Sequence, residues 1–196
     1  MPLKPRPGEH YTIRRKVLTL FGAKFHIYGP GGEVVGYCRQ KAFKLREDIR
    51  LFTDESQSTV LLVMKARQII DFGATYDVML ADGRKIGSLR RKGIASLLRD
   101  SWLIFDPDGE EIGGIKEESG GLAILRRLSD GLVSLISPQT FHADCNRGGR
   151  IATLRTHRNP WVHRISVAIH KNHPDLDETI IIAGGLLIAA IEGRQS

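Results

Sequence analysis

Residues 173–196 read HPDLDETIIIAGGLLIAAIEGRQS, and they contain twelve consecutive residues without a polar side chain, Ile180–Ile191. Asp177 is a candidate N-cap, so we expect a helix over residues 178–192. An α-helix over the apolar run would cover roughly 20 Å, whereas the hydrocarbon core of a bilayer is about 30 Å thick. A helix that is apolar on all sides and too short to span a membrane should be buried on all sides within the protein.

The chain before this helix alternates short apolar stretches with turn-forming clusters, which is typical of β-hairpins. The centres of four candidate hairpins are Gly29–Gly32, Asp54–Ser58, Ala81–Gly83 and Asp106–Gly109. Their predicted strands are Lys24–Tyr28 with Glu33–Lys41, Ile49–Thr53 with Thr59–Arg67, Ala74–Leu80 with Arg84–Lys92, and Ser101–Phe105 with Glu110–Glu118. Further strands are expected at Ile151–Thr156 and His163–Ile169, and a short helix at Gly93–Asp100.

Three of the hairpins share the pattern G-x-x-[VI]-G, at residues 32–36, 83–87 and 109–113. The first glycine closes a turn, and the second lies inside the returning strand, where glycine costs packing and entropy. A glycine placed there three times indicates bends or close backbone approach. An all-β chain that ends in one wholly apolar helix predicts a closed antiparallel β-barrel around that helix. We expect one domain over residues 11–196, preceded by a flexible basic tail at residues 1–10.

The order of these segments resembles the Tubby C-terminal-like superfamily, and within it the LURP-one-related proteins and the phospholipid scramblases. The segments that carry the resemblance are KFHIYGPGGEVVGYCRQK, TYDVMLADGRKIGSLRRKGIASLLRDSWLIFDPDGEEIGGIKEE and PDLDETIIIAGGLLIAAIEG. The resemblance implies a twelve-stranded barrel around a central C-terminal helix. It also implies a link to membranes, phosphoinositides or other phospholipids, but the cysteine-rich and proline-rich segments of scramblases are absent.

The chain has 29 Lys and Arg residues against 22 Asp and Glu residues, a net charge of +7. Residues 1–50 hold eleven of the basic and four of the acidic residues, whereas residues 51–196 hold eighteen of each. Charge confined to the N-terminal quarter indicates a local basic patch or tail and weakens the case for a nucleic-acid-binding protein.

Two basic segments are candidate contacts for anionic lipid head groups, where each cation near the surface contributes about 1 kcal/mol. The alternative is that these cations are solvated and block pairing at strand edges. The candidate residues are Arg84, Lys85, Arg90, Arg91 and Lys92 in one segment and Lys41, Lys44 and Arg46 in the other.

Candidate metal ligands are few. Scramblases carry an acidic segment before the terminal helix that is proposed to bind Ca²⁺, and here the resemblance leaves only Asp175 and Asp177, of which Asp177 also fits a helix cap. The acidic residues from Asp106 to Glu117 partly follow EF-hand spacing, but Glu111 occupies the position that requires glycine. The pairs His142/Cys145 and His170/His173 have the spacing of zinc ligands, but nothing orders one pair against the other.

No G-x-S-x-G, Walker, G-x-G-x-x-G or H-E-x-x-H motif occurs in the sequence, so no enzyme class and no cofactor is indicated. Two cysteines in a chain of 196 residues and an N-terminus without an apolar run predict a cytoplasmic protein. We therefore expect a non-enzymatic peripheral membrane module that binds anionic phospholipid. The alternatives are scramblase-like lipid translocation and a nucleic-acid-binding or transcription-linked protein.

Overall fold

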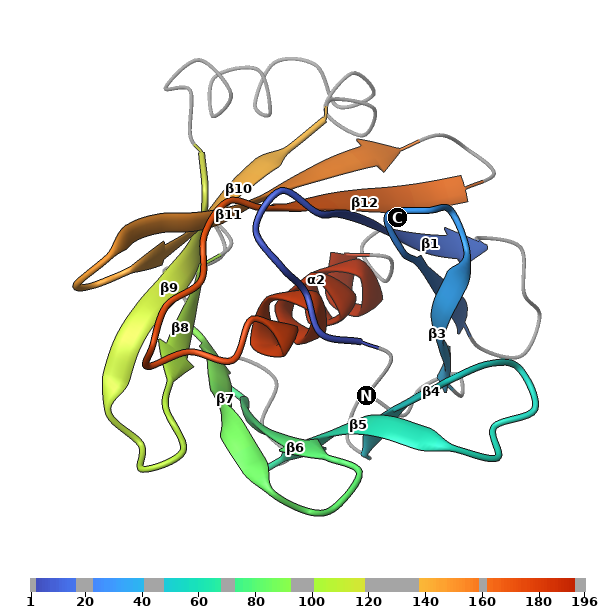
Figure 1. Ribbon diagram of the computed structural model, residues 1–196, viewed down its shortest axis with the longest axis horizontal. Helices are drawn as coiled ribbons and strands as arrows, with labels where there is room; N and C mark the ends of the chain where they lie inside the picture. Colours follow the sequence, from blue (N-terminus) through green and yellow to red (C-terminus); the bar gives the residue numbers. More distant parts are fainter. Residues whose placement is uncertain are drawn as a thin grey trace.

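The computed structural model is a closed barrel of twelve antiparallel strands that surrounds one helix (Figure 1). It describes residues 3–16, 23–40, 48–67, 73–92, 101–118, 138–158 and 162–192. The strands are β1 (His10–Lys16), β2 (Ala23–Tyr28), β3 (Val34–Gln40), β4 (Ile49–Phe52), β5 (Val60–Ala66), β6 (Thr75–Leu80), β7 (Lys85–Arg91), β8 (Ser101–Phe105), β9 (Glu111–Glu117), β10 (Thr140–Cys145), β11 (Gly149–Arg158) and β12 (Val162–Ile169), and the helix is α2 (Thr179–Glu192). The predicted fold class is confirmed.

Each strand pairs with the next strand along the chain, and β1 closes the barrel by pairing with β12. The closing pair runs antiparallel from His10 opposite Ala168 to Lys16 opposite Val162. A closed barrel has no strand edge with unpaired backbone groups. Closure also brings the first strand of the chain, at residues 10–16, against the last strand, at residues 162–169.

The three repeated hairpins use one turn geometry. Gly32, Gly83 and Gly109 have φ angles of 82°, 85° and 97°, a region that disfavours residues with a Cβ. In each turn the glycine N–H donates to the carbonyl of the residue three positions earlier, at 3.0 to 3.2 Å. A shift in strand register accompanies each turn, as expected for a type I turn closed by a bulge glycine.

The second glycine of each motif lies where another part of the chain approaches closely. A Cβ on Gly87 would overlap the carbonyl oxygen of Phe105, and one on Gly113 would overlap that of Asp144. At Gly36 the neighbour is a Leu51 side chain, 3.1 Å from the position of a Cβ. The close backbone approach predicted from the repeated pattern is therefore confirmed at Gly87 and Gly113, whereas at Gly36 the close neighbours are side chains.

Helix α2 is buried around its circumference, from Ile180 to Ala190. Its bounds, Thr179–Glu192, agree with the predicted helix to within one residue. A Cβ on Gly185 would stand 2.8 Å from Ile13 Cδ1 of β1, so glycine allows the strands to approach the helix. Among the residues described, no helix has both the length and the apolar character needed to cross a membrane.

The flexible tail is predicted for residues 1–10, of which the structure describes residues 3–10, and residues before β1 contact the barrel. Leu3 is fully buried, and its carbonyl accepts a hydrogen bond from Thr179 Oγ1 at the start of α2, at 3.5 Å. Gly8 N–H donates to the Ile169 carbonyl at 2.9 Å. In Figure 1 this segment crosses in front of α2. The composition of the tail is basic and proline-rich, but burial of Leu3, which contributes about 1.5–3 kcal/mol, and these hydrogen bonds together favour its contact with the barrel.

The ten predicted strands are confirmed to within two residues at each end, while β1 and β10 were not predicted. In β10, Phe141, Ala143 and Cys145 alternate with polar residues, a pattern weakened by two small apolar side chains. Trp102 is 1% exposed and lies in the core, as predicted. The predicted helix at Gly93–Asp100 and the predicted core residue Trp161 lie outside the described residues.

Candidate ligand-binding face

Five neighbouring strands contain basic residues and no acidic residue. They follow one another around the barrel in the order β11, β12, β1, β2 and β3. Their nine Lys and Arg residues are Arg14, Arg15, Lys16, Lys24, Arg39, Arg150, Arg155, Arg158 and Arg164. Barrel closure thus joins the basic start of the chain to two basic strands near its end.

Strand pairing aligns polar side chains of these strands in one row across the outside of the barrel. The row runs from His157 through Arg164, Arg14 and His26 to Tyr37, and each residue is directly opposite the next. Alternate residues of the same strands point inward and are buried. Two arginines directly opposite each other, Arg14 and Arg164, repel and lower the stability of the sheet.

We call five outward cations of these strands the basic face, namely Arg14, Lys24, Arg39, Arg155 and Arg164; exposed Arg150 is not included, because its Nε lies 3.3 Å from Asp144 Oδ1. None of the five forms an ion pair with another residue that the structure describes. Arg14 Nε is buried and has no hydrogen-bond partner within the described part of the chain. Positive charge that no carboxylate of the described chain neutralises is free to attract an external anion.

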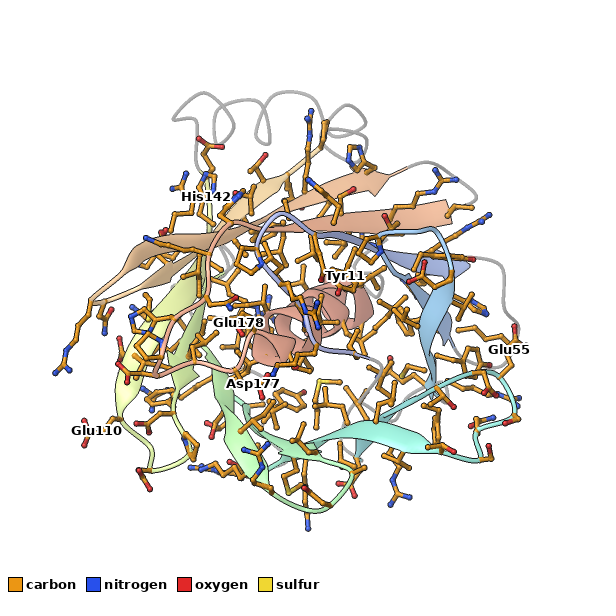
Figure 2. All side chains as sticks on the ribbon, viewed as in Figure 1. Tyr11, Glu55, Glu110, His142, Asp177 and Glu178 are labelled. Atoms are coloured by element: carbon orange, nitrogen blue, oxygen red, sulfur yellow. The ribbon has the colours of Figure 1, made fainter. Side chains whose placement is uncertain are left out.

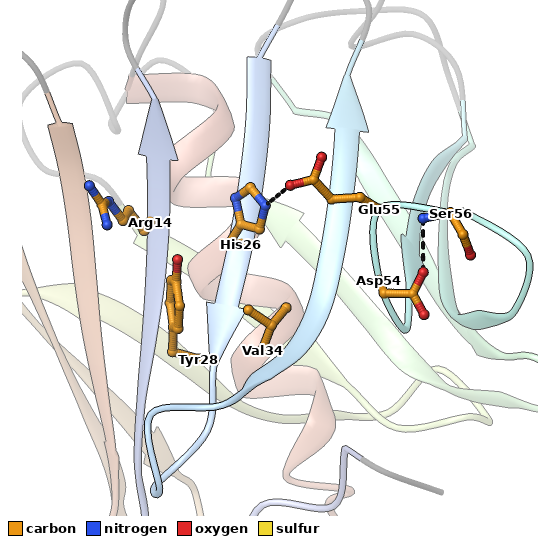
Figure 3. A pocket seen from close by; sticks show the side chains of 7 residues that line it. All are labelled: Arg14, His26, Tyr28, Val34, Asp54, Glu55 and Ser56. Carbon is orange, nitrogen blue, oxygen red and sulfur yellow. Dashed lines mark hydrogen bonds and ion pairs between the residues drawn. The ribbon is translucent and has the colours of Figure 1, made fainter.

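A groove of about 620 Å³ lies at one end of this row (Figure 3). Its floor is the outer surface of β1–β3, with Arg14, His26 and Tyr28, and the turn after β4 forms the opposite wall. That turn contributes Asp54, Glu55 and Ser56, and Val34 lies at the rim. Val34 is 44% exposed and is the most prominent exposed large apolar side chain of the described residues.

Two interactions fix the turn wall of the groove. Glu55 Oε1 lies 2.8 Å from His26 Nε2, and Asp54 Oδ1 accepts a hydrogen bond from Ser56 N–H, also at 2.8 Å (Figure 3). The hydrogen bonds from Ser56 and Thr53 lower the pKa of Asp54, so this carboxylate stays ionised. The His26 ring packs on Tyr37, with centroids 5.1 Å apart, and burial raises the pKa of the Tyr37 hydroxyl.

The predicted lipid contacts of strand β7 lie six strands from β1 in the twelve-stranded ring, on the opposite side of the barrel. Lys85 Nζ donates to the Pro107 carbonyl at 2.9 Å and lies 3.6 Å from Asp77. The Arg90 guanidinium stacks over the Phe105 ring, 4.8 Å from its centroid.

The other predicted lipid contacts lie beside these residues or outside the described chain. Arg84 and Lys92 are exposed at the two ends of the strand, and Arg91 lies next to Lys92. Lys41, Lys44 and Arg46 lie outside the described residues.

Asp77 also binds Arg67 through two hydrogen bonds, at 2.7 and 2.8 Å. These bonds hold the pKa of Asp77 below its usual range, because the guanidinium stabilises the carboxylate. Part of the positive charge near β7 is therefore neutralised within the protein. The structure brings the β7 cations together on their own hairpin and does not join them to the basic face.

The sequence was compared with models of known protein families. The family model described as LURP-one-related matches residues 34–188. The chain belongs to the LURP-one-related family. The predicted resemblance to that family is confirmed, and the match runs from β3 into α2. No curated protein and no solved structure gives a significant match.

In this LURP-one-related chain one of the two candidate calcium ligands, Asp177, caps the helix, and the other, Asp175, does not. Asp177 Oδ1 accepts a hydrogen bond from Thr179 N–H at 3.0 Å, which is the geometry of an N-cap. Asp175 is half exposed and lies 3.9 Å from His173 Nδ1. Figure 2 shows Asp177 and Glu178 beside the first turn of α2.

The other candidate metal ligands have partners of different kinds. His142 Nε2 lies 3.3 Å from Glu118, Cys145 Sγ donates to the Ile112 carbonyl, and His170 Nε2 lies 2.8 Å from Thr153 Oγ1. Asp106 Oδ1 accepts from the N–H groups of Gly109 and Glu110 and so stabilises its turn. Within the described ranges, no three His, Cys, Asp or Glu side chains are grouped as a metal site would need.

Neither the basic face nor the groove was predicted from the sequence. A count of charges along the chain places Arg14, Lys24 and Arg39 in an N-terminal excess, but it leaves Arg155 and Arg164 in a balanced remainder. The signal that could have found the face is the absence of acidic residues from 10–16, 23–28, 34–40, 149–158 and 162–169, read together with the closure of a barrel.

Proposed function

We infer that this LURP-one-related barrel is a non-enzymatic module that binds the surface of membranes containing anionic phospholipids, phosphoinositides among them. The observation that carries this proposal is the basic face, in which five outward cations have no carboxylate partner within the described chain. Because the face is the outer surface of adjacent strands, its charges can approach a flat lipid surface together.

The expected strength of binding follows from the charge count. Each Lys or Arg near an anionic bilayer contributes about 1 kcal/mol, so five residues supply up to about 5 kcal/mol. The interaction should weaken at high salt, since the Debye length falls from about 10 Å at 0.1 M to about 3 Å at 1 M. Helix α2 takes no part in this binding and stays inside the barrel.

Co-sedimentation with lipid vesicles tests the proposal. Neutral phosphatidylcholine vesicles are compared with vesicles that also contain a phosphoinositide, at moderate and at high salt. The variant R14Q/R155Q/R164Q removes three charges from the basic face and should weaken binding about 100-fold, which corresponds to about 3 kcal/mol. Equal sedimentation of the wild-type chain with both kinds of vesicle would contradict the proposal.

The hairpin of β7 supplies the matched control. R84Q/R90Q/K92Q removes the same charge from exposed positions on the opposite side of the barrel and should leave binding nearly unchanged. If this control lost binding while the basic-face variant kept it, the hairpin residues predicted from the sequence would be the contacts. Equal losses in both variants would show that net charge alone, and no particular face, attracts the lipid.

The two alternatives predict different results in related assays. A scramblase-like protein would exchange fluorescent lipid between the two leaflets of reconstituted vesicles, which a surface-binding module does not do. A nucleic-acid-binding protein would be displaced from anionic vesicles by duplex DNA at low concentration. Either result would replace membrane binding as the function of the basic face.

A further inference from the structure

Two hydroxyl side chains lie beside the pair of arginines on the basic face. Arg14 of β1 is directly opposite Arg164 of β12, and Thr12 is directly opposite Ser166 in the same two strands. The residues between them along each strand, Ile13 among them, are buried, so these four side chains point outward. Pairing geometry places them at the corners of a rectangle of roughly 5 Å across the strands by about 7 Å along them. We call these four residues the arginine–hydroxyl cluster.

The cluster presents positive charge and hydrogen-bond donors. Neither Arg14 nor Arg164 forms an ion pair with another residue that the structure describes, and Arg14 Nε is buried without a hydrogen-bond partner there. Figure 3 shows the His26 ring between Arg14 and Glu55, and the Arg14 guanidinium extends away from Glu55. Like charges directly opposite each other destabilise a sheet, and so does a buried donor without an acceptor. An anion bound between the two arginines would remove both unfavourable effects.

The donors of the cluster suit a phosphomonoester. At pH 7 a phosphomonoester carries a charge of about −1.5 to −2 and has three terminal oxygens. A phosphodiester carries a single negative charge and has two terminal oxygens. A guanidinium group binds phosphate through two parallel hydrogen bonds, and each hydroxyl can donate one more. Two guanidinium groups therefore match the charge of the monoester, and the hydroxyls supply donors for its third oxygen.

The residues next to the cluster favour a lipid as the source of the phosphate. Tyr28 of β2 is directly opposite Thr12, and Val34 of β3, which is 44% exposed, is directly opposite Tyr28. A tyrosine and an exposed apolar side chain suit contact with a membrane interface. We propose that the arginine–hydroxyl cluster binds the phosphomonoester head group of a membrane lipid, with Tyr28 and Val34 against the adjoining part of the lipid. This inference rests on the proposed membrane binding and adds the head-group chemistry that the face selects.

Phosphatidic acid and phosphatidylglycerol provide the test, because the phosphate of the first is a monoester and that of the second is a diester. Each lipid is mixed with phosphatidylcholine so that both kinds of vesicle have the same zeta potential. The wild-type chain should then bind the phosphatidic acid vesicles about fivefold more tightly, the factor that corresponds to one further cation paired with the phosphate.

Two double variants remove phosphate recognition and keep the charge of the basic face. R14K/R164K keeps both positive charges and loses the planar guanidinium groups that donate in pairs. T12V/S166A removes the two hydroxyls and alters no charge. Each variant should bind the two kinds of vesicle equally, and circular dichroism with thermal melting verifies that each one folds.

The hairpin of β7 again supplies the matched control. R84K/R90K makes the same replacement of arginine by lysine on the opposite side of the barrel, and it should keep the preference for phosphatidic acid. Loss of the preference in this control would place phosphate recognition on the hairpin and overturn the inference.

The outcomes for the two proposals are distinguishable. Absence of binding to either lipid contradicts membrane binding, while equal binding of the wild-type chain to both contradicts only the phosphomonoester site. A preference that survives in either double variant also overturns the inference. Glycerol 3-phosphate carries the same phosphomonoester without acyl chains. If it displaced the protein from vesicles at a concentration equal to that of phosphatidic acid, the ligand would be a soluble phosphate ester and the lipid assignment would be wrong.

Discussion

At the scale of single residues, glycine positions show how tightly the barrel is packed. A Cβ on Gly113 would overlap the backbone carbonyl of Asp144, and a backbone atom on a neighbouring strand cannot rotate away as a side chain can. Gly113→Ala should therefore separate β9 from β10 locally and lower the free energy of unfolding by about 2–3 kcal/mol, as overpacking does. Urea denaturation of the two proteins measures the difference.

Gly73 provides the control for this substitution. A Cβ there would meet nothing within 4 Å, and its φ angle is not positive. Gly73→Ala should leave stability unchanged or raise it by about 0.5 kcal/mol, because alanine restricts the unfolded chain. Equal stability of the two alanine variants would contradict the packing assigned to Gly113.

The carboxylate of Asp77 also contributes to the stability of the folded state, and this contribution depends on pH. Its pKa is lowered, first by the hydrogen bonds from Arg67, so ionised Asp77 stabilises the folded state above its unfolded pKa of about 3.9. That stability is lost as the pH falls through the folded pKa. Asp77→Asn should lower the free energy of unfolding by about 1 kcal/mol at pH 7, a small value because Arg67 is half exposed.

Urea denaturation at pH 7 and near pH 2 tests this expectation. The difference between wild type and D77N should shrink as the pH falls, because protonation of the wild-type carboxylate removes its ion pair with Arg67. Asp108→Asn, at an exposed turn position, should change stability at neither pH. A difference for D77N that is equally large at both pH values would point to packing and not to the ion pair.

Among the helices and strands, those predicted correctly from the sequence have a pattern contained within a few neighbouring residues. The run Ile180–Ile191 fixes α2 almost to the residue, and the glycine motifs fix three turns, because each signal lies within a few neighbouring residues. Strand β1 gives no such signal. Its sequence, HYTIRRK, has few apolar residues, and it forms a strand because β2 and β12 pair with it on both sides.

Substitutions at the start of α2 can distinguish whether Asp177 caps the helix or binds calcium. Asp177→Ala removes the acceptor for Thr179 N–H and should lower the free energy of unfolding by about 1 kcal/mol. Asp175→Ala removes a half-exposed carboxylate that does not cap the helix and should have little effect. Thermal melts with and without Ca²⁺ complete the test, and a rise in Tm with Ca²⁺ that Asp177→Ala abolishes would favour a metal site instead.

At the scale of the whole molecule, the candidate site could not be predicted because it belongs to no continuous segment. Arg14 and Arg164 are 150 positions apart in the chain, and they stand opposite each other only through the closure of β1 on β12. The groove also joins separate segments, because the turn after β4 reaches His26 of β2. The sequence contains the required charges, but they lie on one face only because the first and last strands of the barrel pair.

The same closure makes the first strand necessary for the fold. Without residues 1–16, β2 and β12 lose their shared partner, and Ile13 no longer packs near Gly185 of the helix. A chain of residues 17–196 should therefore fail to unfold cooperatively. A chain of residues 9–196 keeps β1 and loses Leu3, so it should fold and be less stable by roughly 1.5–3 kcal/mol, the value of one buried leucine.

Hydrogen exchange on the helix distinguishes these two chains. Amides of Ile180–Ala190 should be protected as strongly as those of the strands in the full chain and in 9–196, because α2 is enclosed by a complete barrel. In 17–196 they should exchange rapidly, since an open sheet exposes the helix to water. A 17–196 chain that melts cooperatively with a protected helix would show that β2 and β12 can close without β1, and it would contradict the dependence of the basic face on that strand.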